Sequence, residues 1–144
     1  MSNTNVQDLV TLIDTKISAV TGIHAVYNYD PASPDDGKYP YATIRFEGSK
    51  AEFGSTNRNI RSFAFKVTVF IDRTKAGFGN GKAERLLREI TDEIVVAFDT
   101  DTTLNGGVLK VEPIEVRTDF ADTEIGDTRV AEYLIDCTLA VATA

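Results

Sequence analysis

Three segments of the chain alternate apolar and polar residues, the pattern of β-strands with one buried face. The first, residues 41–47, places Ala42, Ile44 and Phe46 on one face. The second, residues 60–72, has its apolar positions at Phe63, Phe65, Val67, Val69 and Ile71. The third, residues 129–141, has them at Ala131, Tyr133, Ile135, Cys137, Leu139 and Val141. Shorter strands are predicted at residues 25–29 and 108–118, where Pro113 indicates a sheet edge or a bulge.

Two other segments repeat apolar residues at the spacing of an amphipathic helix. Residues 5–21 carry Val6, Leu9, Val10, Ile13, Ile17 and Val20. Thr4 and Gln7 have capping-box spacing before that helix, and Gly22 is a suitable stop after it. Residues 81–98 carry Ala83, Leu86, Leu87, Ile90, Ile94 and Phe98.

The predicted elements follow the order α-β-β-β-α-β-β. Segments 30–40, 48–59, 99–107 and 119–127 are polar and are predicted to be turns or loops. Strands joined by hairpins form a mainly antiparallel sheet, here of four to five strands, and two amphipathic helices would cover its apolar face. The sequence therefore predicts one two-layer α+β domain over residues 1–144.

The longest predicted strands exceed the helices that would cover them. Thirteen strand residues span about 44 Å at roughly 3.4 Å each. A helix of eighteen residues spans only about 27 Å at roughly 1.5 Å each. Part of the sheet should therefore project beyond the helices, and such exposed strand edges are useful when a neighbouring subunit covers them.

Composition excludes several classes of protein. The chain has 22 acidic and 15 basic residues, a formal net charge of −7, which argues against tight binding to nucleic acid. One histidine, His24, and one cysteine, Cys137, are too few for a structural zinc site. Cys137 falls on the apolar face of its strand and is predicted to be an inert core thiol. No apolar run approaches membrane-spanning length, and the first ten residues do not resemble a signal peptide.

The stretch GFGNGKAERLL, residues 77–87, combines glycines with a lysine before a helix, as phosphate-binding loops do. Its glycines are one residue too close for a P-loop, and Ala83 stands where the metal-binding hydroxyl belongs. The dinucleotide fingerprint fails at Lys82. We therefore interpret the stretch as a strand-to-helix connection with Lys82 in the first turn, and we expect no cofactor.

Acidic residues gather in two of the predicted loops. They are Asp30, Asp35 and Asp36 in the first, and Asp119, Asp122, Glu124 and Asp127 in the second. Neither set has the spacing of an EF-hand loop. Solvated loops, a divalent-ion site, or a surface that repels passing DNA all remain open for them.

With this topology, the sequence resembles a tail terminator, or tail-completion protein, of a tailed bacteriophage. The resemblance spans nearly the whole chain and lies in its size and element order. It lies further in the hairpin YATIRFEGSKAEFGSTNRNIRSFAFKVTVFIDR, the helix GKAERLLREITDEIVVAF and the strand RVAEYLIDCTLAVATA.

The resemblance implies a structural protein rather than an enzyme. Such proteins form a hexameric ring that caps the tail tube, ends its polymerisation and docks the tail to the head connector. The implied partners are further copies of the chain, the tube protein and the connector or stopper protein. DNA would pass through the lumen, and no membrane is involved. The chain would be made in the host cytoplasm and reside at the tail–neck junction of the virion.

Exposure and charge, rather than a family motif, suggest residues for these contacts. The candidates for the subunit interface are Glu47, Lys50, Glu52, Arg58, Arg61, Lys66, Thr68 and Phe70. The two acidic loops are candidates for lumen or partner contacts. Another phage neck or head-completion protein, an adaptor domain that binds a peptide at a sheet edge, and a small metal-dependent enzyme are alternative interpretations.

Overall fold

The computed structural model describes residues 6–28, 40–55, 58–72, 80–101, 103–104, 110–111, 114–123 and 126–142. These residues include two helices, α1 (Val6–Ser18) and α2 (Asn80–Asp99). The strands are β1 (Ala25–Tyr27), β2 (Tyr41–Ser55), β3 (Arg58–Asp72), β4 (Lys110–Val111), β5 (Glu115–Thr123) and β6 (Gly126–Ala142).

The strands form one sheet in the order β1-β2-β3-β6-β4, and β5 also pairs with β6. Every pairing is antiparallel except that of β1 with β2, which is parallel. The predicted fold class is therefore confirmed. The parallel pair departs from the expected run of hairpins, because β2 begins beside the start of β1, with Tyr41 opposite Ala25. His24, between α1 and β1, donates its backbone N–H to the carbonyl of Pro40 at 2.8 Å and fixes this return.

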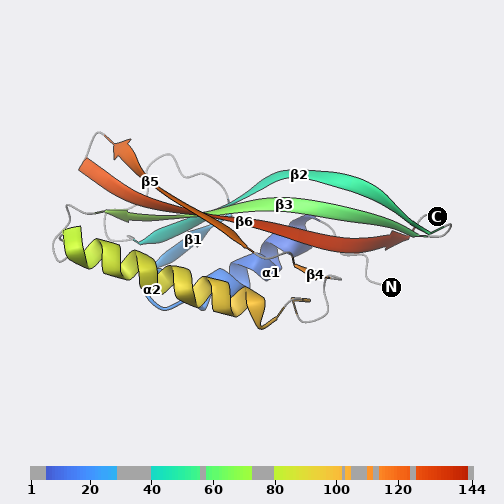
Figure 1. The fold of residues 1–144 in the computed structure, drawn as a ribbon, viewed down its shortest axis with the longest axis horizontal. Helices are drawn as coiled ribbons and strands as arrows, with labels where there is room; N and C mark the ends of the chain where they lie inside the picture. Colours follow the sequence, from blue (N-terminus) through green and yellow to red (C-terminus); the bar gives the residue numbers. More distant parts are fainter. Residues whose placement is uncertain are drawn as a thin grey trace.

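Both helices cover the same face of the sheet, as the alternating strands predicted (Figure 1). The apolar positions of the central strand β3, from Phe63 to Ile71, are all buried on that face. The helices contribute the buried side chains Leu9, Ile13, Ile17, Ala83, Leu87, Ile90, Ile94 and Phe98 to the same core. Of the predicted helical stripes, Val6, Val10 and Leu86 are only partly buried.

Polar contacts at the margins of this core fix the helices on the sheet. The Tyr133 hydroxyl on β6 lies 2.7 Å from the Thr91 hydroxyl on α2, and burial raises the pKa of Tyr133 to about 12. Arg129 on β6 donates from Nε to Glu84 on α2 at 2.9 Å. The Lys16 ammonium of α1 lies 2.7 Å from the Asp101 carboxylate beyond α2. Each contact joins two elements and so fixes how the helix layer lies across the strands.

Cys137 is fully buried on the helix-covered face, as predicted from its position in the alternation. Burial raises the pKa of its thiol to about 12, and the negative charge of Asp136 adds to this effect. Because the thiolate is the reactive form, the folded chain holds this cysteine in its unreactive state.

The sheet projects beyond its helices, as the strand and helix lengths predicted. β2 and β3 have 15 residues each and β6 has 17. Figure 1 shows the ends of these three strands running together past both helices. Near this end Arg61 lies on the helix side of the sheet, where it donates to the Ser49 hydroxyl at 3.1 Å. On β3, a polar side chain thus follows the apolar ones at this end, while Leu139, opposite Arg61 on β6, is still buried.

Two predicted loops are wrong. The segment 48–59 was expected to be a polar turn, yet β2 continues to Ser55 and β3 begins at Arg58. The segment 119–127 is also mostly a hairpin, formed by the end of β5 and the start of β6, with Asp122 opposite Asp127. In both places the strands carry polar residues on consecutive positions, so the alternation that marks a half-buried strand is missing.

The predicted strand 108–118 is divided into β4 and β5, both of which pair with β6. Val111 lies opposite Cys137 and Glu115 opposite Leu134, so four steps on one side match three on the other. Pro113 lies outside the described residues. The one-residue slip is nevertheless the kind of interruption that its missing N–H led us to expect.

A β-bulge at Gly48 divides β2. Phe46 lies opposite Phe65, but Gly48 lies opposite the next residue, Ala64, so Glu47 is an extra residue on β2. Gly48 has a backbone φ of 142°, which L-amino acids with a side chain rarely adopt. No atom lies within 4 Å of the place where a Cβ would stand. Glycine is therefore favoured at this position by the backbone conformation and not by steric crowding.

We predict that Gly48→Ala lowers the free energy of unfolding by about 1–3 kcal/mol, the usual range for a strained backbone conformation. Gly81→Ala is the matched control, because Gly81 lies in α2 with equally open surroundings and no positive φ. The control should leave stability unchanged or raise it by up to about 1 kcal/mol. Urea denaturation followed by circular dichroism measures both, and equal stabilities for the two variants would contradict the bulge argument.

Candidate assembly surface on the open face of the sheet

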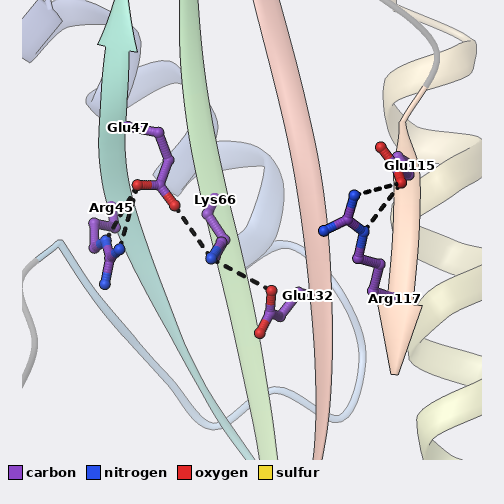
Figure 2. A network of polar contacts seen from close by, with 6 residues as sticks. All are labelled: Arg45, Glu47, Lys66, Glu115, Arg117 and Glu132. Atoms are coloured by element: carbon purple, nitrogen blue, oxygen red, sulfur yellow. Dashed lines mark hydrogen bonds and ion pairs between the residues drawn. The ribbon is translucent and has the colours of Figure 1, made fainter. Parts of the chain in front are cut away.

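Charged side chains form a chain of ion pairs across the face of the sheet that the helices leave open (Figure 2). Lys66, on the central strand β3, lies between two carboxylates. Its Nζ is 3.2 Å from Glu47 Oε1 on β2 and 3.4 Å from Glu132 Oε2 on β6. Arg45 Nη2 lies 3.3 Å from Glu47 Oε2. We call Arg45, Glu47, Lys66 and Glu132 the ion ladder.

Strand register and the bulge together assemble the ion ladder. Arg45 lies directly opposite Lys66, where two like charges would otherwise repel each other. The extra residue at the bulge is Glu47, whose carboxylate lies beside both cations. Glu132 is opposite Thr68 and therefore reaches Lys66 diagonally across β3 and β6. Glu47 follows Arg45 by two residues and so faces the same side of β2, where its carboxylate lies between the two cations.

The ladder lowers the pKa of the Glu47 carboxyl. Partial burial acts in the opposite direction and raises this pKa. The hydrogen bond from Lys66, the charges of Arg45 and Lys66, and the hydrogen bond from Arg45 outweigh that effect. Glu47 therefore favours its charged form more strongly in the folded protein than in the unfolded chain.

A second ion pair occupies β5 on the far side of β6 from Lys66. Arg117 Nη2 lies 3.0 Å from Glu115 Oε1, and both side chains are more than half exposed. Figure 2 shows the Arg117 guanidinium pointing from β5 toward the strand that carries Glu132. The open face therefore presents fixed charges from β2 across to β5.

An aromatic cluster and a hollow lie beside the ion ladder. The rings of Tyr41 and Phe70 stack with centroids 4.7 Å apart, and Tyr27 meets Tyr41 edge-on at 5.8 Å. A hollow of about 240 Å³ opens where β1 ends and β2 continues. Its lining includes Asn28, Ile44, Arg45, Phe46, Lys66 and Phe70.

The structure brings only some of the predicted interface residues together. Glu47, Lys66, Thr68 and Phe70 lie side by side on the open face, and Lys50 is exposed beyond the bulge. Arg61 lies on the opposite, helix-side face with Ser49, so it belongs to a different surface. The side chains of Glu52 and Arg58 lie outside what the structure describes.

The structure describes the predicted lumen residues only in part. Asp30, Asp35, Asp36 and Glu124 lie outside the described residues. Asp119, Asp122 and Asp127 belong to the backbone of the β5–β6 hairpin, and nothing is described of their side chains. Their assignment to a lumen therefore stays a prediction.

The sequence reasoning missed Glu132 as a partner of Lys66. A signal was present, since Glu132 alternates with the buried Ala131 and Tyr133 and so must face away from the helices. The sequence does not show the register of β3 and β6, which sets Glu132 opposite Thr68 and so next to Lys66. Arg117 and Glu115 were missed for the same reason.

Within the described residues, no group of three or more His, Cys, Asp or Glu side chains is placed to hold a metal ion. None of the described helices is long and apolar enough to cross a membrane. What the described residues define on the open face is a charged and partly aromatic surface.

Comparison with known proteins supplies a match in structure only. No protein-family model matches the chain, and no curated protein matches its sequence. The fold is similar to that of a chain in the virion of a native gene transfer agent (GTA) particle, with a TM-score of 0.56 and 16% sequence identity. The similarity covers 97% of this chain and 100% of the other. The two chains therefore share a fold over their whole length.

We predict that Lys66→Met raises the pKa of Glu47 toward its ordinary value, as measured by NMR titration of the carboxyl group. Because the folded-state pKa of Glu47 is lowered, its stabilising contribution is present above the unfolded-state pKa and is lost as the pH falls through the folded-state pKa. The stability difference between wild type and variant should be below about 1 kcal/mol at pH 7 and should shrink below pH 4.

Arg117→Met is the control for this titration. Arg117 pairs with Glu115 on its own strand and, among the described residues, makes no hydrogen bond or ion pair with the ion ladder. The control should leave the Glu47 titration unchanged. A Glu47 pKa that is the same in wild type and Lys66→Met would contradict the ladder.

Proposed function

We propose that this chain is a structural virion protein of a tailed phage or a related particle. In this proposal six copies form a ring that caps the tail tube, ends tube polymerisation and docks the tail to the head connector. The observation that carries it is the match in fold, over the full length of both chains, to a component of the GTA virion.

The overhanging strands support self-assembly. β2, β3 and β6 extend together past the helices, and in the described part β2 pairs with β1 only from Tyr41 to Thr43. A strand edge left open over such a length is an aggregation hazard for a monomer. A neighbouring subunit that covers it removes the hazard. Ring closure needs a contact between two different patches of the subunit, repeated around one axis.

The charge of the chain supports a lumen through which DNA passes. A formal net charge of −7 repels phosphate, so DNA would not adhere to the wall of the ring. The acidic candidates of segments 30–38 and 119–127 would face the lumen or the partner proteins in this arrangement. The tube protein and the connector would bind opposite ends of the ring.

The proposed function requires no chemistry at the site. Cys137 is buried and protonated, and the ion-ladder charges are neutralised by one another. These features suit a surface whose role is to hold a fixed shape and charge pattern. We therefore place the chain among the non-enzymatic components of a virion.

The proposal is tested by negative-stain electron microscopy and sedimentation of the concentrated protein, alone and mixed with assembled tail tubes. We expect six-fold rings with a central hole, a mass about six times the 15.7 kDa of the chain, and tubes capped at their ends. A chain that stays monomeric in solution and leaves every tube end bare would contradict the proposal.

A further inference from the structure

One lateral edge of the sheet is formed by β2, and most of its length has no neighbouring strand. β1 pairs with β2 only from Tyr41 to Thr43, although β2 continues to Ser55. From Ile44 to Lys50, the backbone of β2 makes hydrogen bonds to β3 and to no other described element. Such an edge presents a row of free N–H and C=O groups, which one further extended strand can satisfy.

The opposite lateral edge is formed by β5. This strand pairs with β6 from Glu115 to Thr123 and with no other described strand. From Glu115 to Thr118, its backbone makes no hydrogen bond to a described element other than β6. Because β3 and β6 lie between the two edges, β2 and β5 of one chain cannot pair with each other. Each copy therefore carries two different open edges.

The directions of the strands decide how two copies can join. β2 is antiparallel to β3, β3 to β6, and β6 to β5, so β2 and β5 run in opposite directions within one subunit. A rotation about an axis that lies roughly along the strands keeps the direction of every strand. If such a rotation sets β5 of one subunit beside β2 of the next, the two strands meet antiparallel, as most strands of the sheet do.

We infer that β5 of each subunit pairs antiparallel with β2 of the next copy of this chain, so that the sheet continues from subunit to subunit. This inference rests on the proposed ring, since it names the two different surfaces that ring closure joins. A strand edge is satisfied by another strand, and the chain itself supplies a second open edge. A peptide from an unrelated protein would cover one edge and leave the other bare, whereas a second copy covers both around a closed ring.

Side chains on the open face set the register of this pair. Val116 packs against the core, so Glu115 and Arg117 lie on the open face of β5. On β2, Glu47 and, beyond the bulge, Lys50 share that face. With Glu47 opposite Arg117, the extra residue of the bulge brings Lys50 opposite Glu115, and both pairs join opposite charges. A shift by two residues in either direction sets like charges against each other.

The charges choose the register, and the free backbone groups supply the attraction. Lys50 is exposed and makes no ion pair with any described residue. Glu47 and Arg117 already have partners within their own chain, so they add little to the strength of the contact. Lys50 is therefore the side chain that gains a partner when the two edges meet.

Disulfide cross-linking of the full chain tests the pairing. Directly opposite residues on antiparallel strands have Cβ atoms about 4.5–5.5 Å apart, within reach of a disulfide after a small adjustment. The variant Lys50→Cys/Glu115→Cys has one thiol on each edge, so oxidation links successive subunits. Cys137 does not interfere, because it is buried and the pKa of its thiol is raised to about 12. Oxidation is carried out at a concentration at which sedimentation velocity shows the wild type assembled.

We expect a ladder of bands from dimer to hexamer on a non-reducing gel, lost when a reductant is added. Lys50→Cys/Arg117→Cys is the register control, because these positions are diagonal in the inferred pairing, about 7–8 Å apart. Lys50→Cys/Arg88→Cys is the surface control, because Arg88 is 75% exposed but lies on α2 and not on a sheet edge. Both controls should give no ladder. Circular dichroism establishes that every variant is folded.

The outcomes separate this pairing from the ring itself. Rings seen by electron microscopy in a Lys50→Cys/Glu115→Cys sample that gives no ladder would overturn the pairing and leave the ring standing. A ladder of equal yield from either control would overturn the inferred pairing as well. A wild-type chain that stays monomeric at every concentration and leaves tail tubes uncapped would overturn the pairing and the ring together.

Discussion

The pairing of β3 with β6 is the interaction on which the remaining structure depends. The two strands stay in register from Arg58 opposite Ala142 to Asp72 opposite Thr128, with no interruption. Every other strand attaches to this pair, either directly or through β2, and both helices pack on its buried face. Strands this long cannot be covered end to end by helices that rise only about 1.5 Å per residue. The uncovered length is a geometric consequence of the central pair.

The open face of the sheet has no helices over it and is exposed to solvent. In place of apolar side chains it presents alternating charges on β2, β3 and β6, which remain solvated while they neutralise one another. The aromatic stack of Tyr41 and Phe70 covers the sheet near β1, where the edge is closed by a parallel strand. Past β1, the edge of β2 carries Phe46 and Arg45.

Periodicity was sufficient to predict the covered half of this fold. Phe63 to Ile71 on β3 and Ala131 to Leu139 on β6 alternate because helices bury every second residue, and all of these are buried as expected. The same reasoning failed at 48–59 and 119–127, where no helix imposes the alternation. Lys66 was recognisable as an exposed candidate. Glu47 was a candidate as well, but its contact with Lys66 was not predicted, because it depends on the pairing of β2 with β3. Glu132 was missed, because its contact with Lys66 depends on the register between β3 and β6.

The ends of β2, β3 and β6 that extend past the helices differ from the covered part of the sheet in how readily their backbone hydrogen bonds open. Where helices cover the strands, breaking a hydrogen bond exposes buried apolar side chains, so those amides open only with most of the core. Beyond the helices, the same ladder of hydrogen bonds has little apolar cover to hold it closed. Local opening of such a segment costs far less than global unfolding. One continuous pair of strands thus combines a core of high local stability with an end that opens at lower free energy while the core stays folded.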